Sequence, residues 1–124
     1  MSSPFRAAVE ARDHPALVAT LAEDVVFRSP AVFKAYEGRD AVGFVLGGAL
    51  KVFEDFRYTA ELSDGDREVL MFEARVGDRE LQGADFLLLD ADGRVKELVV
   101  MVRPLSGLTA LAEAMGRLLA QSGG

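Results

Sequence analysis

The spacing of hydrophobic residues predicts helices in the first half of the chain. Apolar side chains recur three and four positions apart over residues 5–12, again from Asp13 up to Glu23-Asp24, and over residues 39–53. Asp13 is the expected N-cap of the second helix, with Pro15 in its first turn. We expect Glu23-Asp24 to end this helix pair.

A two-residue period, which is typical of strands, dominates the rest of the chain. A first strand over residues 25–29 stops at Pro30, and residues 31–38 form a loop. Ser106 is the expected cap of a last helix within residues 105–121, whose continuous apolar stripe must pack on another surface. Four further strands are predicted over residues 56–62, 68–76, 81–89 and 95–103.

This order of elements predicts a single α+β domain over residues 1–124. We expect a curved antiparallel or mixed sheet wrapped around the three N-terminal helices, with the C-terminal helix appended.

The turn Gly77-Asp78 predicts the register of the two strands beside it. With a two-residue loop there, Phe72 lies opposite Gly83 and Leu70 lies opposite Asp85. Asp85 then shares one face of the sheet with apolar side chains. We call this the inner face.

The opposite, outer face is also apolar near its middle, at Val69, Met71, Ala84, Phe86 and Leu88. The three N-terminal helices can cover only one side of the sheet. Two interpretations remain open: a homodimer packed through the outer face, which is the simpler one, or a monomer whose last helix folds across it.

Composition narrows the function classes. The chain has 124 residues, 50% of them hydrophobic, and 20 acidic against 14 basic residues give a net charge of -6. This charge disfavours nucleic acid and acidic membrane surfaces as partners. There is no Cys and one His, so we expect no disulfide framework and no multi-His or thiolate metal site. Without a secretory signal or a long apolar run, we expect a cytoplasmic protein that contacts no membrane.

Four segments together resemble the nuclear transport factor 2-like superfamily, and within it the SnoaL-like and ketosteroid-isomerase-like groups. They are residues 13–21, 22–30, 37–42 and 90–95, and the likeness extends from about residue 5 to residue 103. The resemblance implies a conical α+β fold with a deep apolar cavity at its open end, usually in a dimer packed through the outer sheet face. Members of this superfamily include isomerases, cyclases, ligand-binding proteins and interaction modules, so the fold alone decides little.

The resemblance also implies where a catalytic site would lie. In ketosteroid-isomerase-like enzymes a carboxylate before the Pro that ends the first strand transfers the proton, and Ser29 stands there. A Tyr on the first helix holds the developing oxyanion, and Phe5 is the aligned residue. A carboxylic acid on the strand before the last hairpin is retained as Asp85. A hydroxyl is a poor base near neutral pH, so Asp85 is the one candidate catalytic residue.

Asp85 is predicted to be a buried, neutral acid because apolar residues surround it on the inner face. The competing interpretation is a carboxylate bonded to the backbone or paired with Arg28 or Arg57. Ser29 and Tyr36 can bind a polar group near the cavity mouth, whereas His14 is expected to be solvated. The candidate ligand-binding residues are Phe5, Ser29, Tyr36, Leu70, Phe72, Asp85, Leu87, Leu98, Val100 and Val102.

Three functions remain open. The first is a protein that binds a small apolar molecule with one polar oxygen, silent or weak in catalysis. The second is an isomerase or cyclase in which Asp85 acts as acid or base on a ketone-like substrate. The third is a dimeric interaction module. No phosphate loop, nucleophile elbow or calcium loop is present, and we expect no cofactor and no metal.

Overall fold

A computed structural model of the chain describes residues 3–122. Six strands and four helices follow one another as α1 (Pro4–Glu10), α2 (His14–Ala19), β1 (Leu21–Arg28), β2 (Tyr36–Glu37), α3 (Arg39–Val52), β3 (Glu54–Asp64), β4 (Arg67–Val76), β5 (Arg79–Leu89), β6 (Val95–Arg103) and α4 (Leu105–Ser122).

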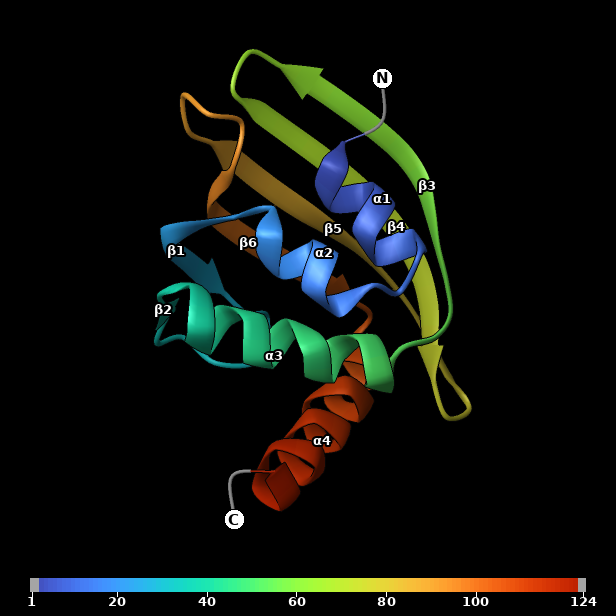
Figure 1. Ribbon diagram of the computed structural model, residues 1–124. Coiled ribbons are helices and arrows are strands. Elements are labelled where there is room, and N and C mark those ends of the chain that lie inside the picture. The colour runs from blue at the N-terminus through green and yellow to red at the C-terminus, as the bar shows by residue number, and fades with distance from the viewer. Residues whose placement is uncertain (1–2, 123–124) are drawn as a thin grey trace.

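The strands form one curved, mixed sheet in the order β2-β1-β6-β5-β4-β3, in which β1 runs parallel to β6 and all other neighbours are antiparallel. Helices α1, α2 and α3 lie on the concave face, and α4 extends from the end of β6 below them (Figure 1). The predicted α+β fold, with a bent sheet around three helices and an appended C-terminal helix, is confirmed. Within the described residues, no helix is both long enough and apolar enough to cross a membrane.

The predicted register of β4 and β5 is confirmed. Phe72 pairs with Gly83 and Leu70 pairs with Asp85 across the hairpin. The N-cap of α2 is also confirmed, because the Asp13 side chain accepts a hydrogen bond from the Ala16 N–H at 3.1 Å. Turn and cap residues act locally, so their effects can be predicted without knowledge of the tertiary structure.

The first strand begins earlier than predicted. β1 starts at Leu21, so Glu23 and Asp24 lie within a strand instead of ending a helix. Both acidic side chains are exposed, and the pairing with β6 shifts register between Leu21 and Val26, which interrupts the two-residue period. The predicted loop 31–38 also contains β2, which pairs with β1.

Two helix ends differ from the prediction as well. α1 ends at Glu10, and Arg12 adopts a positive φ of 53° in the turn that leads to α2. Ser106 lies inside α4 and does not cap it: the helix begins at Leu105, and the Leu108 N–H donates to the Pro104 carbonyl at 3.0 Å. The carbonyl that accepts this first helical bond belongs to Pro104, so Pro104 occupies the N-cap position and Ser106 is the second helical residue.

Helix α4 packs on the inner side of the sheet. Its Leu111 is buried in one cluster with Phe72, Ala74 and Leu81. A close approach to α3 occurs at Gly48, where an added Cβ would lie 3.2 Å from Met115 Cε. Close packing therefore accounts for this glycine in the middle of a helix. The last helix does not cover the outer face.

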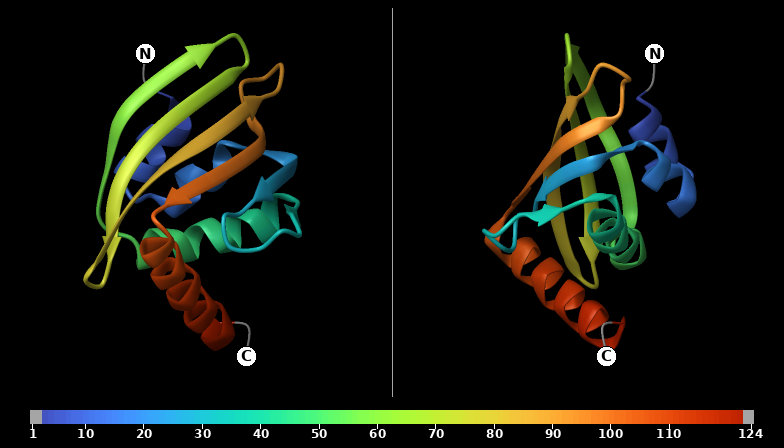
Figure 2. Two further views of the ribbon diagram at one scale, coloured as in Figure 1. Left: turned by 180° about the vertical axis from the view of Figure 1, so that it is seen from behind. Right: turned by 60° about the vertical axis from the view of Figure 1, so that its left-hand side comes forward.

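The outer face of β4, β5 and β6 is exposed in the single chain. Met71, Phe86 and Met101 are 45%, 37% and 59% exposed, respectively. Seen from behind, this face of the sheet lies in front of α1 and α2, while α4 extends below the strands (Figure 2, left). Alternation along the strands therefore gives a buried inner face and an open apolar outer face.

Candidate functional site

The cone encloses a cavity of about 350 Å³ between the inner face of the sheet and helices α1, α3 and α4. Its wall is mostly aliphatic and aromatic, with Asp85 and Tyr58 in its interior and Glu10, Arg12 and Ser29 among its exposed or half-buried residues. A cavity of this size with few polar groups is typical of a site for a small apolar molecule.

The structure brings seven of the ten predicted ligand-binding residues to this cavity: Phe5, Ser29, Tyr36, Phe72, Asp85, Leu98 and Val100. The other three do not line it. Leu70 and Leu87 are fully buried in the core that packs against α1 and α2, and Val102 packs beside Leu111 near α4. These three positions lie on the inner face, as predicted, but their side chains are not part of the cavity wall.

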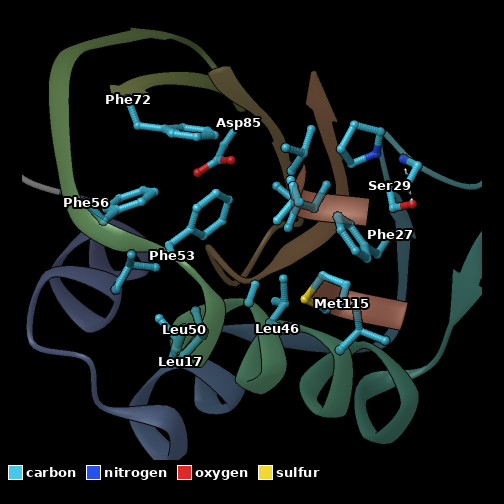
Figure 3. A pocket seen from close by; sticks show the side chains of 18 of the residues that line it. Leu17, Phe27, Ser29, Leu46, Leu50, Phe53, Phe56, Phe72, Asp85 and Met115 are labelled. Carbon is cyan, nitrogen blue, oxygen red and sulfur yellow. Dashed lines mark hydrogen bonds between the residues drawn. The ribbon is translucent and has the colours of Figure 1, made fainter. Parts of the chain in front are cut away.

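The Asp85 carboxyl lies among aromatic rings. Phe53 and Phe56 flank it together with Phe72 (Figure 3), and the rings of Phe56 and Phe72 stack with centroids 4.9 Å apart. The Phe72 ring lies over Gly83, where an added Cβ would come within 2.6 Å of the Met101 carbonyl oxygen and would clash with the ring. Glycine at this position therefore lets Phe72 lie flat beside the acid.

Burial favours the neutral form of Asp85. Its side chain is 7% exposed, and desolvation raises the pKa of Asp85 from 3.8 to about 7. A hydrogen bond from the Tyr58 hydroxyl to Asp85 Oδ2, at 3.1 Å, opposes this rise because it stabilises the carboxylate. At neutral pH the carboxyl group thus exchanges readily between a form that donates a proton and a form that accepts one.

The alternative partners considered for Asp85 are paired elsewhere. Arg28 lies 3.4 Å from Glu97, and Arg57 donates to Glu73 on the outer face. The interpretation of Asp85 as half of an ion pair with either arginine is therefore wrong.

Tyr58 is the functional candidate that sequence reasoning missed. It lies on β3, pairs with Phe72 and faces inward beside Asp85. Burial and the neighbouring carboxylate raise the pKa of Tyr58 well above its usual value, so its hydroxyl is a hydrogen-bond donor at all physiological pH values. The hydrophobic pattern gives no signal for it, because the register shift at Thr59 reverses the face on which a regular strand would place Tyr58.

A second buried carboxylate is Glu68, which is 8% exposed on the inner side of β4. It lies two residues before Leu70 on the same strand and pairs with Leu87 of β5. It is not part of the cavity wall. Glu68 was not among the predicted site residues, although the alternation of side chains along β4 predicts that it faces inward.

Ser29 and Tyr36 line the cavity away from Asp85. The Ser29 hydroxyl accepts hydrogen bonds from the N–H groups of Ala31 and Val32, at 3.3 and 3.1 Å, and lies on the other side of the cavity from Asp85 (Figure 3). The Tyr36 ring stacks on Phe27 with centroids 6.0 Å apart. Ser29 thus serves a turn beside Pro30, with no base in contact to activate it.

His14 is exposed but not merely solvated. Its Nε2 lies 2.7 Å from the Gly43 carbonyl oxygen and forms a hydrogen bond that joins α2 to α3. An added Cβ at Gly47 would meet this ring at 2.8 Å, so His14 has a packing role outside the main cavity.

The family of the chain follows from comparison with known proteins. The model of the SnoaL-like domain family matches residues 4–98, which include α1 to α3 and all strands except the end of β6. The chain belongs to the SnoaL-like domain family. A solved structure of an NTF2-like protein shares the fold of this SnoaL-like protein, in line with the fold that the sequence resemblance implies. The comparison with curated proteins found no match.

Two solved structures share substantial sequence with this SnoaL-like protein. A steroid delta-isomerase from Pseudomonas aeruginosa is 48% identical, with a TM-score of 0.91, over 95% of this chain and 88% of that chain. A bacterial protein with a cystatin-like fold from Silicibacter pomeroyi is 33% identical, with a TM-score of 0.91, over 94% of this chain and 83% of that chain.

A more distant relative shares the fold alone. An NTF2-like protein from Mesorhizobium loti is 20% identical, with a TM-score of 0.72, over 81% of this chain and 85% of that chain.

Proposed function

We propose that this SnoaL-like protein binds a small apolar molecule that carries an oxygen atom, with Asp85 as the polar group that recognises that oxygen. The observation that carries the proposal is the carboxyl group of Asp85, a residue that is 7% exposed, in a mostly apolar cavity of about 350 Å³. A buried polar group that faces empty space costs free energy unless a ligand satisfies it. The protonated Asp85 donates to the ligand oxygen while its other oxygen accepts from Tyr58.

The apolar wall supplies the affinity. Phe53, Phe56 and Phe72 offer ring faces on one side of the cavity, and Met115 of α4 lies on another (Figure 3). Each apolar square ångström removed from water contributes roughly 25 cal/mol. A rigid ligand of several fused rings, with a ketone at one end, matches this division between many apolar contacts and one hydrogen bond.

A thermal-shift experiment tests ligand binding. Progesterone, a rigid apolar ketone, is expected to raise the Tm by several degrees when present at about 100 times its Kd, which corresponds to about 2.7 kcal/mol. Palmitate is the comparison: it is also mostly hydrocarbon but is flexible and anionic, and we expect a smaller shift. A flat response to both would favour the interaction module over a binding protein.

A second candidate function is the isomerisation of an unsaturated ketone. Two observations favour it: the 48% identity to a protein described as a steroid delta-isomerase, and the pKa of Asp85 of about 7. The Asp85 carboxylate would take a proton from the carbon between the ketone and the double bond, then return it to the far alkene carbon. The double bond moves into conjugation and no atom is gained or lost.

We also propose that two copies of this protein pack through the outer face. Met71, Ala84 and Met101 form one row across β4, β5 and β6, and Val69, Phe86 and Val99 form the next. An apolar sheet face of this kind is typical of a protein interface.

Sedimentation velocity tests the dimer. The wild type is expected to sediment as a dimer and Met101→Glu as a monomer, because a charge placed on the 59% exposed Met101 would be desolvated in the interface. Phe44→Glu, at a 50% exposed apolar residue of α3, is the matched control and should remain dimeric. A monomeric wild type would refute the proposal.

A further inference from the structure

Arg6 contacts the site from outside the cavity. It lies on α1, 24% of its side chain is exposed, and its guanidinium carbon is 5.4 Å from the centroid of the Tyr58 ring. Its Nη1 donates to Glu61 Oε1 at 3.0 Å, and its Nε lies 3.3 Å from Glu10 Oε2. The cation therefore lies over the aromatic ring whose hydroxyl donates to Asp85.

A β-bulge in β3 makes this arrangement possible. Tyr58 pairs with Phe72, and Ala60 pairs with the next residue of β4, Met71, so Thr59 is an extra residue. Without it, Tyr58 and Glu61, three positions apart, would lie on opposite faces. With it, Tyr58 and Glu61 both face inward, where one reaches Asp85 and the other reaches Arg6.

We propose that Arg6 is a positioning residue that holds the Tyr58 ring, through Glu61 and the ring face, so that the hydroxyl points at Asp85. Arg6 does not itself line the cavity and its side chain makes no hydrogen bond or ion pair with Asp85, so it acts through Tyr58. The inference rests on the proposed function, because that function is what makes the alignment of Asp85 important. Its test uses no ligand, so it fails or succeeds independently of ligand binding.

The charged and titratable groups around Asp85 are few in the described residues. Tyr58 of β3 is its hydrogen-bond partner; Arg6 and Glu10 of α1 lie behind Tyr58, Glu68 is on the neighbouring strand β4, and Arg12 and Tyr36 line more distant parts of the cavity. The hydrogen bond from Tyr58 lowers the pKa of Asp85, so loss of its alignment raises that pKa.

Carbon-13 NMR of the Asp85 carboxyl, titrated in the ligand-free protein, tests the inference. Tyr58→Phe is expected to raise the pKa of Asp85 by about 1 unit. Arg6→Gln should raise it by at least about half as much, and Arg6→Lys, which keeps the cation over the ring, should restore most of the wild-type value. In the double variant the rise should not exceed that of Tyr58→Phe alone, because both changes remove the same hydrogen bond.

Arg28→Gln is the matched control. It breaks an exposed arginine–glutamate pair, Arg28 with Glu97, and should leave the Asp85 titration unchanged. If Arg6→Gln does not fold, Glu61→Gln replaces it and is expected to raise the pKa in the same way. Two results would overturn the proposal. One is a folded Arg6→Gln or Glu61→Gln variant in which Asp85 titrates as it does in the wild type. The other is a double variant in which the two pKa shifts add.

Discussion

Asp85→Leu is expected to weaken progesterone binding roughly 10- to 100-fold at about pH 6. Leucine keeps the approximate shape of the side chain but leaves the ligand oxygen without its hydrogen-bond partner in an apolar cavity, and such a loss costs about 1–3 kcal/mol. Asp85→Asn retains a donor and an acceptor, so its affinity should stay within about tenfold of the wild type. Isothermal titration calorimetry measures both.

The Asp85→Asn variant also separates binding from catalysis. If the protein is an isomerase, Asp85→Asn binds progesterone but loses about 10²- to 10⁴-fold in kcat on a β,γ-unsaturated steroid ketone, because an amide cannot carry the proton. Ultraviolet absorbance of the conjugated product follows this turnover. A wild type that binds progesterone and converts no such ketone would leave binding as the function.

The second large effect concerns stability. The contribution of Asp85 to the free energy of unfolding is expected to be fully present below about pH 4 and to be lost as the pH rises to about 7. Burial raises its pKa to about 7 in the folded chain, against about 3.9 when unfolded, so between these values the folded state retains a proton that the unfolded state has lost. The total loss is on the order of 4 kcal/mol.

Urea unfolding of the wild type and Asp85→Asn isolates this contribution, because the other carboxyl groups are common to both chains. Relative to the wild type, Asp85→Asn should gain about 3 kcal/mol between about pH 5 and about pH 8. An unchanged difference between the two proteins across this range would show that burial does not perturb Asp85.

The register of β4 and β5 could be predicted because a two-residue turn and a two-residue period determine it locally. Gly77-Asp78 placed Asp85 on the inner face, and the structure agrees. Which inner residues border the cavity depends on how the helices pack over the sheet. Leu70 and Leu87 are covered by the core beside α1 and α2, and no local pattern indicates this.

Tyr58 shows why part of the site could not be predicted. Counting back from the β3–β4 turn in a regular ladder, Asp64 lies opposite Arg67, and Tyr58 would then fall opposite Glu73, on the outer face. The bulge at Thr59 reverses this and turns Tyr58 inward. A single extra residue in a strand leaves no clear mark on the hydrophobic pattern, so the partner of Asp85 emerges only from the structure.

The central claim is that a neutral Asp85 recognises a ligand oxygen inside the cone. Calorimetric titration of progesterone between about pH 5 and about pH 9 tests it most directly. We expect constant affinity below about pH 7, a fall of about tenfold per pH unit above it, and an Asp85→Asn variant whose affinity does not change with pH. A wild-type affinity as independent of pH as that of the variant, or no binding at any pH, would contradict it.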